Sequence, residues 1–344
     1  MQFVKHNVNF DFIGKSKIGF GLSLTIIIAG IISLIIHNGP KLGIDFAGGT
    51  NIRIQFSQEV PISKIRTAFS KIGLEKASVQ KVGKDEEHEF QISTSKPEMT
   101  DKGFAQSISE AVEAETSVKP IIRQIEMVGP QVGKDLRKKA LLAIFYSLLF
   151  ITIYISGRFE LKWIISGVTA GALMTVVYFL SVMNLSMVAI IPIALIISLI
   201  LFWYLKLFYA MSAIIALIHD VFITIGIFSI LGYEFSLPVI AALLTIIGYS
   251  LNDTIIVFDR IRENITHDNS KSSLSEKINK SINGTLSRTI LTSLTTLLVL
   301  IALFFLGGQI IHNFTFAMIV GVVVGTYSSI FIASPIILIA KKGE

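Results

Sequence analysis

The sequence contains no cysteine, and charged residues are scarce in it. Without cysteine the chain has no disulfide, no thiolate metal site and no cysteine nucleophile. Charged residues make up 16% of the 344 residues, against about 25% in an average soluble domain, whereas hydrophobic residues make up 52%. Because so few polar side chains cannot cover the surface of a folded protein of this length, lipid must cover part of it. An ordinary soluble protein is therefore excluded.

Sequence patterns of enzymes and of nucleic-acid-binding proteins are missing as well. The sequence has no HExxH or GxSxG pattern and no histidine cluster for a metal, and Gly14-Lys15-Ser16 lacks the upstream glycine of a phosphate loop. The formal charge is +6, but excess lysine and arginine in a membrane protein marks cytoplasmic loops, and no basic nucleic-acid motif is present. We therefore predict no enzyme, no metal or cofactor, and no nucleic-acid partner.

Long apolar runs predict a multi-span membrane protein, since a helix needs about 20 apolar residues to cross the hydrocarbon core. The first run follows Lys15 and Lys17 as in a signal peptide, but it is longer than a signal sequence and lacks a cleavage site. We predict an uncleaved span there. The run 187–231 would be about 68 Å long as one helix, so we place a turn near Lys206. The eight predicted spans are Ile18–Ile36, Ala140–Ile155, Trp163–Met183, Met187–Leu205, Phe208–Leu231, Leu237–Phe258, Thr289–Leu306 and Phe314–Ala340.

A polar stretch at 37–139 separates the first two spans and predicts a soluble domain. Residues 51–56 alternate between apolar and polar side chains as a strand does, whereas 62–72 has apolar residues at helical spacing. Further predicted elements are strands at Ala77–Val82, Glu89–Ser95 and Ile121–Met127 and a helix at Phe104–Thr116. The predicted fold class is thus a multi-span α-helical membrane bundle, with one small α+β domain of the ferredoxin-like type between spans one and two.

Lysine and arginine near the span ends predict the orientation. Basic residues gather in four segments: the tail 1–17, the turn at 157–162, a loop at 259–288 and the tail 341–344. Three other connections, at 184–186, 232–235 and 307–313, carry none. The positive-inside rule places both tails and the loop 259–288 in the cytoplasm and the soluble domain on the opposite side. Arg137–Lys139 lie on that opposite side too, but in a large translocated segment, where the rule does not hold.

Three ionisable residues lie inside the predicted spans: His219, Asp220 and Asp253. An ionisable group within a bilayer costs roughly 2.5–3.5 kcal/mol on insertion scales, so each is a candidate functional residue. Each carboxylate continues a row of small or polar residues at helical spacing, and a third row follows Arg288. We predict that the rows pack inward, away from lipid. They are Thr245, Tyr249, Ser250 and Asp253, with Asn252 beside it; Ser212, Ala216, Asp220 and Thr224; and Arg288, Thr292, Thr295 and Thr296.

Desolvation and a nearby arginine both change the proton affinity of a buried carboxylate. A conformational change that moves Arg288 toward or away from Asp253 would therefore load and release a proton. Structural interpretations stay open for each residue. The alternative for Arg288 is snorkelling to the cytoplasmic surface, that for His219 is a hydrogen-bonded core histidine, and that for Asp220 and Asp253 is helix–helix hydrogen bonding.

The segment Gly43-Ile-Asp-Phe-Ala-Gly-Gly-Thr50 is the other compact motif. It predicts a strand edge followed by a glycine turn, in which Asp45 accepts hydrogen bonds from nearby backbone amides. As a phosphate loop it is poor, because no lysine follows the glycines.

Five segments resemble the SecF family of protein-export membrane proteins, and the likeness covers most of the chain. The segment at 237–265 is the longest and most specific of them. The segments are GIDFAGGT at 43–50, VGPQVGKDLRKKAL at 128–141, AMSAIIALIHD ending at Asp220, LPVIAALLTIIGYSLNDTIIVFDRIRENI at 237–265 and SRTILTSLTTLL at 287–298. On these motifs the chain is identified as a member of that family.

The resemblance implies an accessory subunit of the Sec machinery in the bacterial inner membrane, structurally half of an RND-type transporter, with its soluble domain in the periplasm. It would pair with SecD and the SecYEG translocon and use the proton-motive force to assist preproteins across the membrane. YidC and YajC are further candidate partners, beside the translocating preprotein and membrane lipid. Protons would be the coupling ion, and one charge crossing 100 mV is worth about 2.3 kcal/mol.

The resemblance also assigns residues. Asp253 and Arg288 match family residues associated with proton conduction, and Asp220, Asn252 and Thr292 are expected on the same pathway. The family signature of the periplasmic domain corresponds to Gly43, Asp45, Gly48, Gly49 and Thr50.

The sequence departs from the family's six-span pattern after Glu160. An insert at about 161–207 precedes the next matching segment, and we predict that it adds two spans. A re-entrant hairpin is the alternative. Residues 185–191 resemble 235–241, as a partial duplication would.

Other functions stay open beside proton-driven protein export. One is an RND-type proton-coupled transporter half for a small solute or lipid, and another is a structural subunit that stabilises SecD and conducts no protons. An intramembrane enzyme is the least favoured, since no nucleophile, base or metal site is visible.

Overall fold

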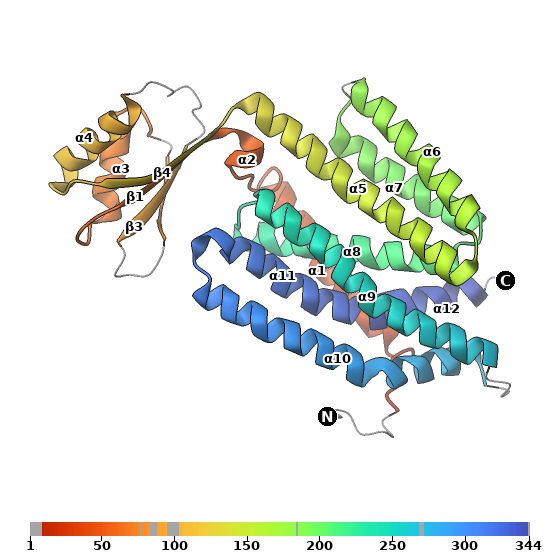
Figure 1. Ribbon diagram of the computed structural model, residues 1–344. Helices are drawn as coiled ribbons and strands as arrows, with labels where there is room; N and C mark the ends of the chain where they lie inside the picture. Colours follow the sequence, from red (N-terminus) through yellow and green to blue (C-terminus); the bar gives the residue numbers. More distant parts are fainter. Residues whose placement is uncertain are drawn as a thin grey trace.

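The computed structural model describes residues 9–75, 77–82, 88–94, 103–183, 185–267 and 272–342. A long helical bundle carries a small sheet domain at one end, called here the domain end (Figure 1). The elements are α1 Ser16–Ile36, α2 Ile44–Ala47, β1 Gly49–Gln55, α3 Ile62–Lys71, β2 Ser78–Val82, β3 Glu89–Thr94, α4 Phe104–Thr116, β4 Ile121–Val128, α5 Pro130–Glu160, α6 Trp163–Val182, α7 Met187–Tyr204, α8 Phe208–Leu231, α9 Leu237–His267, α10 Leu274–Leu306, α11 Gln309–Ser328, a π-helical turn Ser329–Ala333 and α12 Ser334–Lys342.

The sheet domain has the predicted ferredoxin-like architecture. Its elements follow the order β-α-β-β-α-β, and the antiparallel sheet has the strand order β2-β3-β1-β4. Ile52 and Ile54 of β1 point to one face and pack against Phe69 of α3 and Ile108 of α4. The opposite face of the sheet carries polar side chains, so the period-two pattern of the sequence decided which face the helices cover.

Eight helices in the described ranges are long and apolar enough to cross a membrane, which is the predicted number. The soluble domain ends earlier than predicted, however, because α5 starts at Pro130 directly after β4. Residues 130–139 are thus the first turns of the second spanning helix. Proline is favoured at the first helical position, and hydropathy marks only the apolar part of a helix, not its end.

The segment 259–288, predicted as a loop, is mostly helical. The helix α9 continues to His267, and α10 begins at Leu274. A capping box explains the second start: the Ser273 hydroxyl accepts from the Glu276 amide, and the Glu276 carboxylate accepts from the Ser273 amide. Polar residues therefore extend both helices beyond their apolar parts. Asn184, Lys271 and Ser95, which belong to predicted connections and a predicted strand, lie outside the described residues.

The insert forms two antiparallel helices, α6 and α7, of 20 and 18 residues. At 1.5 Å per residue each is about 27–30 Å long, which is enough to span the hydrocarbon core and favours two spans over a re-entrant hairpin. The predicted turn is present at Lys206, whose φ is +54°. Beyond the insert, the Glu160 carboxylate accepts a 2.8 Å hydrogen bond from the Tyr209 amide and so joins the end of α5 to the start of α8.

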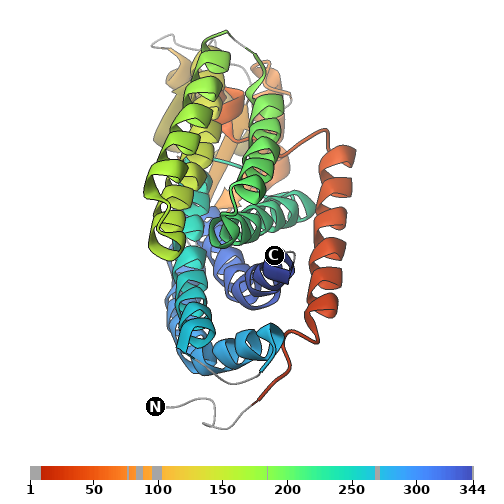
Figure 2. The ribbon, with the colours of Figure 1, turned by 90° about the vertical axis from the view of Figure 1, so that its right-hand side faces the viewer.

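The last predicted span, Phe314–Ala340, is interrupted in the structure. After α11 the chain makes a π-helical turn, in which the Ser334 hydroxyl donates to the carbonyl of Ser329, and then continues as α12. A π turn carries one extra residue and changes which side chains face each neighbouring helix. Viewed along the bundle (Figure 2), α1 lies at one edge and contacts α8 and this turn.

Candidate functional site: a buried polar centre and a domain junction

Asp220 of α8 lies at the centre of the bundle and is 1% exposed. Its Oδ2 accepts hydrogen bonds from the hydroxyls of Ser250 on α9, at 2.6 Å, and Ser328 on α11, at 2.9 Å. Its Oδ1 lies 2.9 Å from Nδ1 of His219. A buried carboxylate is stable in such a place only when hydrogen bonds replace water, and here three side chains do so.

His219 connects this centre to α1. Its Nε2 lies 2.8 Å from the Ser23 hydroxyl, which in turn lies 3.3 Å from the hydroxyl of Tyr327 on α11. Tyr327 donates to the carbonyl of Gly19 at 2.5 Å and stacks on the imidazole ring. Both ring nitrogens of His219 therefore have partners, as the interpretation of a hydrogen-bonded core histidine requires.

Asp253 of α9 is also 1% exposed. The Ser293 hydroxyl of α10 donates to it over a long 3.4 Å contact and lies 2.6 Å from the hydroxyl of Thr326 on α11. Asp253 thus has fewer and longer hydrogen bonds than Asp220. The two carboxylates belong to one polar centre, because Ser250, which binds Asp220, precedes Asp253 on α9.

Three consecutive residues of α11 bind this centre together. Thr326 contacts α10, Tyr327 contacts α1, and Ser328 contacts Asp220 on α8. The π turn begins immediately after them, at Ser329. Turns of this kind are frequent at functional sites and bend the helix that contains them.

Only part of the predicted set of residues converges. Asp220, Asp253 and Ser250 lie together and are buried. Arg288 and Asn252 are exposed. The Thr292 hydroxyl bonds to its own helix, at the carbonyls of Arg288 and Thr289. Within the part of the chain that the structure describes, no hydrogen bond or ion pair joins the Arg288 guanidinium to the Asp253 carboxylate.

The rows predicted to face inward are confirmed on α8, confirmed in part on α9 and corrected on α10. On α9, Ser250 and Asp253 are buried but Thr245 is exposed. On α8 the predicted row is buried: Ser212, Ala216, Asp220 and Thr224. On α10, Arg288 and Thr295 are exposed, and the buried row lies one position away: Ser281, Thr285, Thr289 and Ser293. The signal was present, since four hydroxyl residues at i, i+4 spacing mark a face as clearly as the row that follows Arg288.

The polar residues of the first and last spans that contact this centre were not predicted. Ser23 is a single serine in an apolar run, and the run of hydroxyl residues Thr326–Ser329 was not predicted to be a polar contact. Four successive hydroxyl residues in an otherwise apolar helix cannot all face lipid cheaply, so the run indicated a buried polar contact.

The signature segment forms a junction between the sheet domain and the bundle. Asp45 Oδ2 accepts a 2.8 Å hydrogen bond from the amide of Leu237, the first residue of α9. Asp45 is an acceptor as predicted, but the donor is 192 residues away along the chain and not nearby. The predicted strand edge was wrong, because Ile44–Ala47 form the short helix α2. Gly48 has φ +78°, and a Cβ there would lie 2.9 Å from the Cα of Pro130, so only glycine fits. Gly43, Gly49 and Thr50 belong to the same junction.

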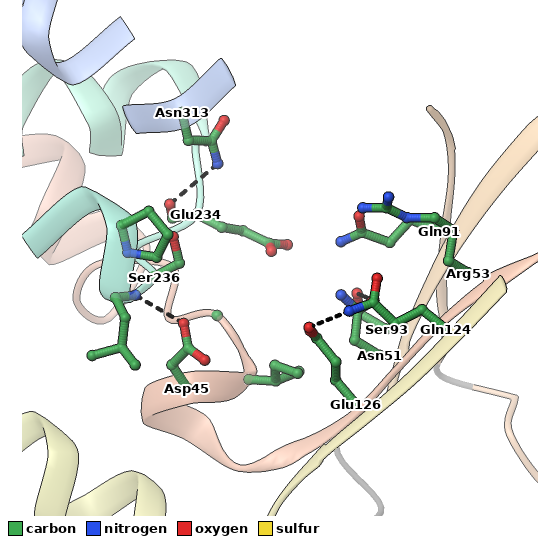
Figure 3. Close-up of a pocket in the computed structure, with 14 residues that line it drawn as sticks. Asp45, Asn51, Arg53, Gln91, Ser93, Gln124, Glu126, Glu234, Ser236 and Asn313 are labelled. Atoms are coloured by element: carbon green, nitrogen blue, oxygen red, sulfur yellow. Dashed lines mark hydrogen bonds between the residues drawn. The ribbon is translucent and has the colours of Figure 1, made fainter. Parts of the chain in front are cut away.

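A cleft of about 340 Å³ lies beside this junction (Figure 3). The open face of the sheet lines one side of the cleft, and Asp45, Glu234, Ser236 and Asn313 line the other side. The described residues contain no group of three histidine, aspartate or glutamate side chains that would hold a metal ion.

Eight apolar helices in the described ranges, two carboxyl groups buried among them and a soluble domain joined to one end define a multi-pass membrane protein with a buried polar centre. Two family profiles match the chain. "Protein export membrane protein SecD/SecF, C-terminal" matches residues 108–190 and 180–343, and "SecD/SecF GG Motif" matches residues 33–60, which contain the junction. The chain belongs to the SecF family of protein-export membrane proteins.

Curated relatives cover nearly the whole chain. The protein translocase subunit SecF of Calditerrivibrio nitroreducens is 36% identical over 343 residues, covering 99% of this chain and 97% of the relative. That of Thermodesulfovibrio yellowstonii is 39% identical over 340 residues, covering 98% and 96%. The SecDF crystal structure from Thermus thermophilus, described as a translocon-associated membrane protein, matches with a TM-score of 0.74 and 30% identity. That match covers 98% of this chain but 39% of the SecDF chain.

Proposed function

We propose that the chain is an accessory subunit of the Sec machinery that, together with SecD, uses the proton-motive force to assist preprotein translocation across the bacterial inner membrane. The observation that carries the proposal is the burial of Asp220 and Asp253 within a bundle whose helices are long and apolar enough to cross a membrane. Intramembrane carboxylates are expensive and mark ion pathways in transport proteins. The names of the curated relatives support the export role.

Asp253 is the proposed proton-carrying group. Among the described residues it has one hydrogen bond, a long one from Ser293, and the Ser293 hydroxyl has a shorter contact with Thr326. Protonation of Asp253 would weaken the Ser293 bond and let Ser293 bind Thr326 alone, so that the contact between α9 and α10 changes. Arg288 precedes Ser293 by five residues on α10, about 7.5 Å along the helix axis, and a rotation or shift of α10 would bring its guanidinium toward Asp253.

The partners in this proposal are SecD, SecYEG and the preprotein, with YidC and YajC as further candidates. SecD is supported by the SecDF structures, which this chain matches over 39% and 40% of their length. Exposed apolar side chains on α6, α7 and α10 are the surfaces expected to meet lipid or SecD. The proton is the coupling ion, and no other cofactor is part of the proposal.

The proposed orientation places the sheet domain in the periplasm. The connections α8–α9 and α10–α11 lie at the domain end of the bundle, whereas α5, α7 and α9 finish at the other end (Figure 1). Arg158, Lys162, Lys206, Arg260 and Arg262 belong to that far end. The positive-inside rule therefore favours a cytoplasmic far end.

The test compares wild-type and Asp253→Asn chains, each co-expressed with SecD in cells that lack SecF. Assembly is checked by co-purification, and the rate at which a secreted precursor matures is measured. We expect the Asn chain to assemble normally and to lose most of the export assistance, because an amide cannot carry the proton. The matched control is Glu263→Gln on the same helix, an exposed carboxylate paired with Arg260. If Asp253→Asn supports export as wild type does, the chain is a structural subunit and the proton mechanism is wrong.

A further inference from the structure

The signature segment lies along the turn that precedes α9. Leu42 and Phe235 form a parallel bridge, made by hydrogen bonds from the Phe235 amide to Lys41 and from the Gly43 amide to Phe235. The Lys41 ammonium lies 3.0 Å from the Glu234 carboxylate. The Asp45 carboxylate then accepts a hydrogen bond from the amide of Leu237, which is one of the first-turn amides that have no partner within their own helix. Residues 41–45 thus hold the start of α9 from outside.

The same segment is the direct continuation of the sheet. The helix α2 leads through Gly48 into β1, the strand between β3 and β4. On its other side it packs against the first turn of α5, where Gly133 faces the carbonyl of Phe46. A movement of α2 is therefore also a movement of the sheet.

Across the cleft the sheet and the bundle are not bonded. Asn51 pairs with Ser93 and Gln124 with Glu126, both pairs on the sheet side, whereas the Asn313 amide donates to the Glu234 carbonyl on the bundle side (Figure 3). In the described ranges, no hydrogen bond crosses from the cleft-lining strand side chains to the bundle. The cleft can therefore widen or narrow without breaking a hydrogen bond of these strand side chains.

We propose that Asp45 is a positioning residue that couples the helix carrying Asp253 to the sheet domain, so that a displacement of α9 changes the width of the cleft. Asp253 lies 16 residues beyond Leu237 in one continuous helix, about 24 Å along its axis. The bridge and the ion pair join residues 41–43 to the turn before α9, whereas the hydrogen bond from Leu237 to Asp45 reaches the helix itself and would transfer this movement to α2. The inference rests on the proposed function of Asp253 and adds the route by which it acts on the soluble domain.

The coupling is measured with a cysteine reporter. Because the chain has no cysteine of its own, the introduced thiol is the one cysteine of this chain that reacts. Gln91→Cys places a thiol on the sheet side of the cleft, and its rate of reaction with a membrane-permeant maleimide is measured in proteoliposomes containing SecD. The labelling rate is compared between chains with Asp253 and chains with Asp253→Asn. Each is made with the native Asp45, with Asp45→Ala and with Asp45→Asn. Glu110→Cys, exposed on α4 away from the cleft, is the control reporter.

With Asp45 present, we expect Asp253→Asn to change the Gln91→Cys rate about fivefold, within the usual range for coupled sites. With Asp45→Ala the change should disappear, whereas Asp45→Asn should keep it, because the amide oxygen still accepts from Leu237. Leu237→Pro removes the donor instead, at a helix position where proline is tolerated, and should act as Asp45→Ala does. The Glu110→Cys rate should not change in any background.

The proposal is overturned if the Asp253→Asn effect persists in Asp45→Ala, if it is absent with Asp45 present, or if Asp45→Asn behaves as Asp45→Ala does. Co-purification with SecD confirms that each variant is assembled. The labelling rates report the coupling and do not depend on export. A failure of the proton mechanism would instead appear as normal export by the Asp253→Asn chain, so the two failures are distinguished. Glu126 lines the same cleft and, among the described residues, bonds to Gln124 of its own strand, so Glu126→Ala should leave both the labelling rate and export unchanged.

Discussion

Gly30 of α1 and Gly226 of α8 lie in direct backbone contact: a Cβ atom on Gly30 would come within 2.7 Å of the Cα of Gly226. Small residues at such crossings let helices in lipid approach closely enough for van der Waals contact and hydrogen bonds between them. Ser33 and Ser229, one turn further along, are joined by a 2.8 Å hydrogen bond. Ser23 lies two turns in the other direction and binds His219. The glycine contact therefore sets the distance over which α1 reaches the polar centre.

Gly30→Val should separate α1 from α8 and break the bond between Ser23 and His219. Overpacking of this kind costs about 1–3 kcal/mol, and we expect a corresponding fall in the stability of the purified protein in detergent, measured by thermal unfolding. The matched control is Gly21→Val on the same helix, where a Cβ meets nothing within 4 Å. Equal stability of the two variants would show that the contact between Gly30 and Gly226 does not hold α1 in place.

Ser250→Ala and Ser328→Ala should each destabilise the bundle. Both hydroxyls donate to Oδ2 of Asp220, and leaving a buried acceptor without its donor costs about 1–3 kcal/mol. The measurement is equilibrium unfolding of each variant, with Thr245→Ala on α9 as the control, since that exposed hydroxyl bonds only to its own helix. The double variant should lose more than either single variant, because Asp220 would then keep only His219. A double variant as stable as wild type would contradict the arrangement.

Replacement of residues 162–206 by a short Gly-Ser linker should leave a chain that folds and assembles with SecD. Lys162 bonds to the carbonyls of Leu205, at 2.8 Å, and Lys206, at 3.1 Å, so the two ends of the insert lie close together. The contact between Glu160 and Tyr209 does not involve the insert and would still join α5 to α8. Lipid would cover the exposed face of α5 at little cost, because acyl chains are as apolar as the side chains they replace.

The measurement for the shortened chain is its accumulation in the membrane and its co-purification with SecD. Glu160→Ala should reduce accumulation more in the shortened chain than in the full chain, since the insert no longer helps to hold the two helix ends. A shortened chain that is degraded even with Glu160 intact would show that α6 and α7 are part of the core and not an addition to it.

Several features of this protein could be predicted from the sequence because they depend on local periodicity. Alternating side chains located β1 and β3, apolar residues at helical spacing located α3, and runs of about 20 apolar residues located the eight spans. Helix ends were less well predicted. Polar first and last turns, as at Pro130 and around Ser273, continue a helix without any change that hydropathy detects.

The candidate site was predicted in part. Asp220 and Asp253 were found because a carboxylate in an apolar run is rare and expensive. Their partners were not predicted. Ser23 is a single serine in an apolar run and becomes significant only when α1 packs against α8, whereas Ser328 belongs to a run of hydroxyl residues that does indicate a buried contact but not its partner. An exposed Arg288 was one of two predicted alternatives, and the structure decided between them, since a rotation of a helix by one residue moves a side chain by about 100°.

The sequence by itself determined that this chain has eight segments apolar enough to cross a membrane, one small sheet domain and two aspartates within its apolar segments, because composition and periodicity act within single segments. Only the tertiary structure decided which hydroxyls hold those aspartates and that Asp45 binds the start of α9. Hydrogen bonds between residues more than a hundred positions apart depend on helix rotation and crossing, and no local pattern records either.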